Sequence, residues 1–99
     1  MSAIIDEALT HLDGMNTSSS APHPYDESSA KELCKFLNDE GVPLPEQDIR
    51  AYGAANGWNP KFTDKIARWA DKINSGGSVV IKFPNSLSEE YKEELRKLK

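Results

Sequence analysis

Apolar residues recur at helical spacing along most of this chain. The clearest stripe has spacings of four, three and four residues, which places its members on one face of a helix. Its members are Phe62, Ile66, Trp69 and Ile73. With Trp58 just before it, this helix has the largest apolar area to bury. We therefore expect the other helices to pack around it.

Capping residues mark both ends of this helix. Asn59 is a strong N-cap residue, and Pro60 suits the first helical position because its fixed φ and missing N–H cost nothing there. Gly57 suits the end of the preceding segment, and Gly76-Gly77 ends the helix after residue 74. The sequence predicts a helix over residues 60–74.

Three further helices are predicted before and after it. The first covers residues 3–13, and a surface loop follows at about residues 15–27, which are rich in serine and proline. Ser29 and Glu32 have capping-box spacing and predict the start of a second helix, which ends at Gly41. A matching pair, Ser86 and Glu89, predicts the start of the last helix.

A third helix in chain order is predicted to begin near Pro45. Its inner face is expected to carry Ile49, Tyr52 and either Ala55 or Asn56. Gly53 lies inside this helix, where glycine costs about 1 kcal/mol relative to alanine. We therefore predict a close approach to a neighbouring helix at this glycine.

Residues 78–83, Ser-Val-Val-Ile-Lys-Phe, have the composition of a β-strand but no evident partner strand. A lone strand cannot satisfy its own backbone groups. We predict an extended segment laid on the helical core, with Val79, Ile81 and Phe83 on one side. Homodimerisation through its edge is the less favoured alternative.

Together these elements predict an all-α fold, a compact bundle of four to five short helices with one short extended segment near residues 78–83. The 99 residues suit a single domain, and 37% hydrophobic with 28% charged residues fits neither a membrane protein nor a disordered one. A single cysteine, Cys34, and an acidic start without a basic leader favour the cytoplasm.

Four short motifs resemble a known family. They are Ile5-Asp6-Glu7-Ala8-Leu9, Gly41-Val42-Pro43, Gly57-Trp58-Asn59-Pro60 and Val79-Val80-Ile81-Lys82. Together they resemble the YoaC-like family of small enterobacterial proteins of unknown function. The resemblance runs over nearly the whole chain and implies an all-helical fold of this size. It implies no catalytic or ligand-binding residues.

No catalytic or metal-binding pattern stands out. His11, His23 and Cys34 are the only soft metal ligands, and no pair of them has the spacing of a helical or loop metal site. Cys34 lies among Leu33 and Phe36, as expected of a buried inert thiol. We expect no metal, no cofactor and no enzymatic activity.

Basic residues form one stripe, beside the apolar face of the 60–74 helix. Lys61, Lys65, Arg68 and Lys72 recur at i, i+4, i+7 and i+11. Such a helix after a short turn, with an extended segment behind it, also occurs in winged-helix nucleic-acid binders. Against that reading stand a pI near 5.1 and two acids on the same helix. A solvated amphipathic helix explains the stripe more simply.

The function expected from the sequence is therefore that of a small, non-enzymatic accessory or protein-interaction domain. Its partner is expected to be a protein rather than a membrane, and the chain a monomer or weak homodimer. The alternative is weak nucleic-acid binding through the four basic residues of the 60–74 helix.

Overall fold

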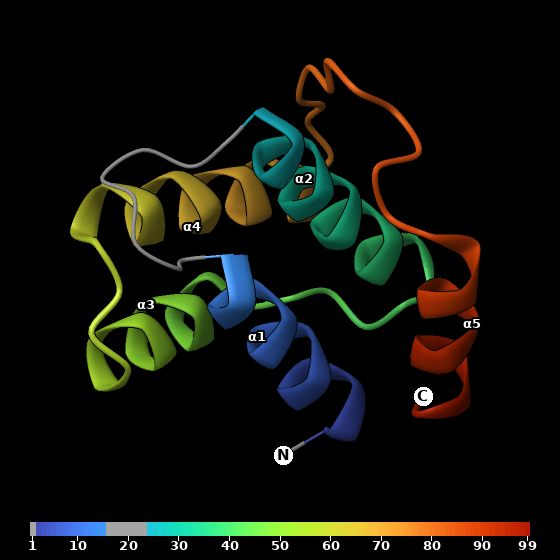
Figure 1. Ribbon diagram of the computed structural model, residues 1–99, viewed down its shortest axis with the longest axis horizontal. Helices are drawn as coiled ribbons and strands as arrows, with labels where there is room; N and C mark the ends of the chain where they lie inside the picture. The colour runs from blue at the N-terminus through green and yellow to red at the C-terminus, as the bar shows by residue number, and fades with distance from the viewer. Residues whose placement is uncertain (1, 16–23) are drawn as a thin grey trace.

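The computed structural model describes residues 2–15 and 24–99, in which five helices and no strand occur. The helices are α1 (Ala3–Met15), α2 (Pro24–Asp39), α3 (Glu46–Ala55), α4 (Pro60–Asn74) and α5 (Glu89–Lys97). α4 packs against both α2 and α3, while α1 contacts α2, α3 and α5 (Figure 1). The all-α prediction is confirmed.

The ends of α4 are capped as predicted. The side chain of Asn59 accepts a hydrogen bond from the backbone N–H of Lys61 at 2.9 Å, and Pro60 opens the helix. Gly57 and Gly76 have φ values of +68° and +90°, in the left-handed region that glycine enters without a steric penalty. These local signals set the bounds of the helix independently of the rest of the fold.

The buried face of α4 differs from the predicted stripe at one position. Phe62, Ile66 and Ile73 are buried, but Trp69 is only half-buried, with the Lys31 ammonium 4.8 Å from its ring centroid. Small residues complete the buried face instead: Thr63, Ala67 and Ala70. Because these side chains are short, the backbones of α2 and α3 can lie close to α4.

Gly53 makes the close approach that was predicted for it. A Cβ atom at this position would lie 2.7 Å from the Thr63 Oγ1 atom and 2.9 Å from the Trp58 ring. Either distance is shorter than van der Waals contact. Of the predicted inner face of α3, Ile49 is buried and Tyr52 half-buried, whereas Ala55 and Asn56 are exposed. The face turns from α4 to solvent in the last turn because the chain must leave the helix there.

Trp58, at the α3–α4 corner, is the tryptophan that lies in the core. It is buried, and its Nε1–H donates to the Asp13 carboxylate at 2.6 Å. Its ring meets Tyr52 and Phe62 edge to face, at centroid distances of 5.5 and 5.4 Å. One side chain thereby joins α1 to the α3–α4 pair.

The boundaries around the predicted loop were partly wrong. α1 continues through Met15, and α2 begins at Pro24, so residues 24–27 form its first turn instead of a loop. Proline suits a first helical position, and Asp26 and Glu27 lie where the helix dipole favours carboxylates. The remainder of the predicted loop, residues 16–23, lies outside the described residues. Ser29 is therefore inside the helix and does not cap it.

Side chains of α2 bind the backbone of the segment that leads to α5. The two carboxylate oxygens of Glu32 accept from the N–H groups of Ser86 and Leu87, at 3.0 and 3.1 Å. Ser28 Oγ accepts from the Phe83 N–H at 3.1 Å, completing the N–H bonds of the segment to this helix. The segment is thus extended and laid on the helical core, as predicted.

The cap of α5 was predicted one turn-position too early. Ser88, not Ser86, is the N-cap residue, and its hydroxyl accepts from the Tyr91 N–H at 3.2 Å. Ser86 is unavailable because its N–H binds Glu32 and its hydroxyl donates to the Phe83 carbonyl. The spacing of Ser86 and Glu89 was therefore fortuitous.

We predict that Gly53→Ala lowers the free energy of unfolding by roughly 1–3 kcal/mol, because its methyl group overpacks the α3–α4 contact. Urea denaturation measures the change. Gly14→Ala is the matched control, since a Cβ there meets nothing within 4 Å. The control should leave stability unchanged or raise it by up to about 1 kcal/mol. Equal stability of Gly53→Ala and the wild type would contradict the close approach.

Candidate interaction surface

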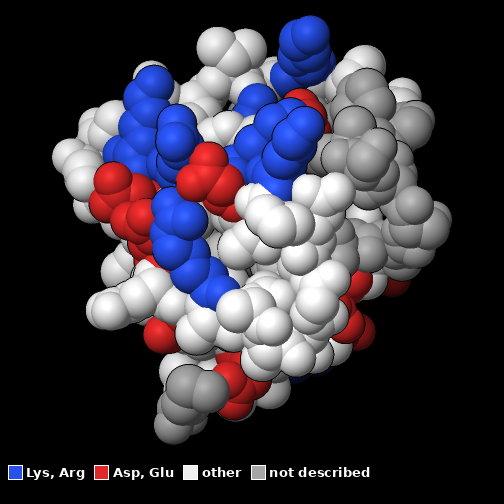
Figure 2. All heavy atoms as spheres, turned by 90° about the vertical axis from the view of Figure 1, so that its left-hand side faces the viewer, with Lys and Arg blue, Asp and Glu red and all other residues white. Residues whose placement is uncertain are grey.

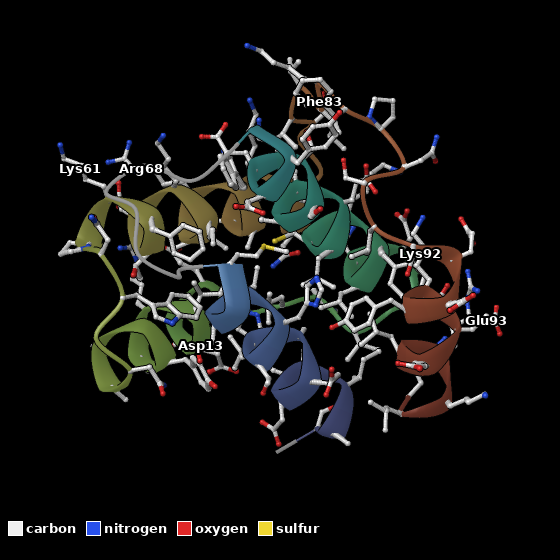
Figure 3. The ribbon with its side chains drawn as sticks, viewed as in Figure 1. Asp13, Lys61, Arg68, Phe83, Lys92 and Glu93 are labelled. Atoms are coloured by element: carbon white, nitrogen blue, oxygen red, sulfur yellow. The ribbon has the colours of Figure 1, made fainter. Side chains whose placement is uncertain are left out.

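The four predicted basic residues lie together on the outer face of α4. Lys61, Lys65, Arg68 and Lys72 are all exposed. Figure 2 shows the lysine and arginine side chains gathered in the upper part of this face, with acidic side chains between them. Lys61 and Arg68 point away from the helices (Figure 3).

Two of these four charges already have partners. Arg68 Nε lies 3.0 Å from Asp64, and Lys65 Nζ lies 3.3 Å from Glu27 on α2. Within residues 2–15 and 24–99, Lys61 and Lys72 have no carboxylate partner within ion-pair distance. Exposed ion pairs contribute little stability, yet they reduce the charge offered to a polyanion. Nucleic-acid binding through α4 stays a prediction.

The soft metal ligands are dispersed. Cys34 is buried in α2, His11 stacks on Tyr91 with ring centroids 4.3 Å apart, and His23 lies outside the described residues. In the part of the chain that the structure describes, no three His, Cys, Asp or Glu side chains are grouped as metal ligands. Burial raises the pKa of the Cys34 thiol to about 12, so the thiolate is scarce at neutral pH.

A cleft that the sequence did not indicate lies between α1, α2 and the start of α5. It has a volume of about 660 Å³, and its lining includes Glu7, His11, Ser29 and Tyr91. The Tyr91 hydroxyl donates to the Glu7 carbonyl at 3.4 Å. Burial lowers the pKa of His11 and raises that of Tyr91, so both rings are neutral at neutral pH. Three separate elements line this cleft, and only the fold brings them together.

An apolar ridge of Tyr25, Val80 and Phe83 crosses the beginning of α2. The exposed fractions of these side chains are 55%, 76% and 37%. The rings of Tyr25 and Phe83 stack with their centroids 4.6 Å apart, although one belongs to α2 and the other to the extended segment. The segment projects beyond α2 (Figure 1), and Phe83 lies near its tip (Figure 3).

Part of this ridge was legible in the sequence. The alternation of residues 79–82 placed Val79 and Ile81 inward and Val80 outward, and both inner side chains are half-buried. Tyr25 was missed because its residue was assigned to a loop. Pro24 followed by two acids was the available sign that a helix begins there.

The described residues contain no helix with the length and apolar character needed to span a bilayer.

The structure is that of a small all-α protein in which one extended segment lies across a helix. The chain belongs to the family described as a domain of unknown function (DUF1889), whose model matches residues 1–96. It is 42% identical over 98 residues to the Escherichia coli K12 protein named "Uncharacterized protein YoaC", covering 99% of each chain. A Shigella flexneri protein of the same name matches equally. The resemblance to the YoaC-like family is thereby confirmed.

Two solved structures from Salmonella typhimurium share this fold. A crystal structure is 46% identical, with a TM-score of 0.92 over 97% of this chain and 96% of that one. A solution NMR structure is also 46% identical, with a TM-score of 0.89 over 99% of this chain and 90% of that one. These relatives establish the fold and the kinship, and the function is argued below from the surface.

We predict that a thiol reagent labels Cys34 in the native protein more than about a hundred times slower than in the unfolded protein at the same pH. The reason is that the side chain is buried and its thiolate is disfavoured. Absorbance of the released reagent in buffer and in urea measures both rates. The assay needs no background correction for other thiols, because Cys34 is the only cysteine. Native and unfolded rates within a few-fold of each other would contradict the buried position.

Proposed function

We propose that this chain is a small, non-enzymatic protein-interaction domain that binds its partner through the apolar ridge of Tyr25, Val80 and Phe83. The observation that carries the proposal is the position of the exposed large hydrophobic residues. In the described residues four such side chains are exposed, and three of them are on this ridge; the fourth is Leu98. Clustered exposed apolar side chains are a common mark of a binding surface.

The ridge is held in place before any partner arrives. Lys31 Nζ donates to the Val80 carbonyl at 2.8 Å, and Ser28 holds the backbone of Phe83. Stacking on Tyr25 restricts the Phe83 ring further. A surface that is ordered beforehand loses less conformational entropy on binding, which favours affinity.

A role in binding rather than catalysis agrees with the state of the reactive groups. The one thiol is buried with a raised pKa, which disfavours nucleophilic attack by Cys34. A free buried cysteine also suits a reducing compartment, and a cytoplasmic location is part of the proposal. The partner is a protein, and the chain itself is a monomer or weak homodimer.

The proposal predicts that a double variant, Val80→Asp with Phe83→Asp, loses a partner that the wild type retains. Both substitutions place a carboxylate on the ridge and leave the α2 contacts of the backbone intact. Immobilised wild type and variant are exposed to an Escherichia coli lysate, and retained proteins are quantified by mass spectrometry. A retained protein counts only if its purified form binds the wild type at least about tenfold more tightly than the variant.

Leu98→Asp is the matched control, since it charges an exposed apolar side chain away from the ridge. It should retain the same partner as the wild type. Circular dichroism of all three proteins verifies that they are folded. If the ridge variant and the control retain the same proteins as the wild type, the ridge is not the binding surface.

A further inference from the structure

We propose that the partner contributes an extended acidic segment, which pairs as an added β-strand with the backbone of residues 79–81. This inference rests on the proposed function, because it names the chemistry of the partner that the ridge binds. It uses two features that the ridge alone does not require: unpaired backbone groups beside it and lysine side chains around it.

The backbone groups of Val79 and Ile81 are available for pairing. Residues 78–81 contain no helix, turn or bend, and the bend begins at Lys82. Within the described residues, neither Val79 nor Ile81 makes a backbone hydrogen bond. Buried backbone groups are nearly always paired, so these unpaired groups face solvent. They offer two N–H donors and two carbonyl acceptors to an incoming chain.

The direction of these groups follows from the Val80 contact. Lys31 on α2 binds the Val80 carbonyl, so this carbonyl points toward α2. Carbonyl groups of successive residues in an extended chain point to opposite edges. The groups of Val79 and Ile81 therefore lie on the edge away from Lys31. That edge is the one at which a partner strand can add.

Side chains on either side of this edge set what the partner must carry. Val80 points out to solvent, and Phe83 with Tyr25 extends the apolar surface beside it. An added strand with alternating apolar residues covers Val80 on that face. Main-chain pairing supplies affinity in such complexes, and side chains at alternate positions supply specificity.

Charge selects an acidic strand. In the described part of the chain, Lys82 has no ion-pair partner, and Lys31 binds only the Val80 carbonyl and the face of Trp69. The nearby carboxylates are engaged: Glu27 with Lys65, and Glu32 with two backbone amides. A protein of net charge −4 thus presents unneutralised lysines beside the open edge. Carboxylates on the partner complement them.

A second copy of this chain is a poorer occupant. Pairing two copies through residues 79–81 brings both Lys82 side chains and both Lys31 side chains to one interface. Like charges placed opposite each other across a strand pair are destabilising. Weak homodimerisation through this edge is accordingly disfavoured against an acidic partner.

The test uses a short peptide, acetylated and amidated, in which valine alternates with glutamate. NMR spectra of the ¹⁵N-labelled protein follow the titration. We expect binding with a dissociation constant below about 1 mM. We also expect slower hydrogen exchange at the amides of Val79 and Ile81 in the bound state. The matching valine–lysine peptide should bind at least about tenfold more weakly at low salt.

A charge variant of the protein tests the lysine contribution. Lys82→Gln should weaken binding of the acidic peptide several-fold, whereas Lys97→Gln, an exposed lysine on α5, should not. Equal binding of the acidic and basic peptides would overturn the inference. So would absence of binding, or binding that leaves the exchange of the Val79 and Ile81 amides unchanged.

The peptide experiment and the lysate experiment fail independently. If the ridge variant loses its partner but the acidic peptide does not bind, strand addition is wrong and the interaction surface stands. If no retained partner depends on the ridge, the proposed function itself is wrong.

Discussion

Three side chains of α2 do for the segment of residues 78–88 what a neighbouring strand does in a sheet. Ser28, Lys31 and Glu32 lie at helical spacing on one face, and together they bind four backbone groups of the segment. Hydrogen bonds to a charged group contribute about 1.5–3 kcal/mol each, more than those between neutral groups. Glu32 is nearly inaccessible to solvent, and its two carboxylate oxygens are satisfied by these amides.

The rest of the structure depends on this contact at two places. It places the apolar ridge, because Val80 and Phe83 are held through their own backbone atoms. It also places the start of α5, because Leu87 is buried directly before the cap at Ser88. The opposite face of α2 packs on α4, whose short side chains allow that approach. One helix therefore supports the core on one side and the candidate surface on the other.

Local signals predicted the elements, and long-range contacts decided the surface. Asn59, Pro60 and Gly76 act on the backbone within a turn or two, so the bounds of α4 were correct from the sequence. Glu32 appeared to be a capping residue because only residues near it in the chain were considered. Its real partners are 54 and 55 residues away, and no spacing rule reaches that far.

The same distinction explains the candidate site. The basic stripe of α4 was predictable because it follows from helical periodicity alone. The pairing of Lys65 with Glu27 and the stacking of Tyr25 on Phe83 were not, since each joins segments that are distant in sequence. Trp69 was expected in the core because the stripe weighted all four members equally. The structure places it at the edge of the buried face, where the aliphatic part of Lys31 and solvent share it.

Hydrogen exchange of the backbone amides, followed by NMR in the isolated protein, tests the role of α2 most directly. If α2 side chains replace a partner strand, the amides of Phe83, Ser86 and Leu87 exchange slowly although they belong to no helix or sheet. The amides of Val79 and Ile81 then exchange rapidly, and Glu32→Ala abolishes the protection of Ser86 and Leu87. Rapid exchange of Ser86 and Leu87 in the wild type, at the rate of Val79 and Ile81, would contradict the account.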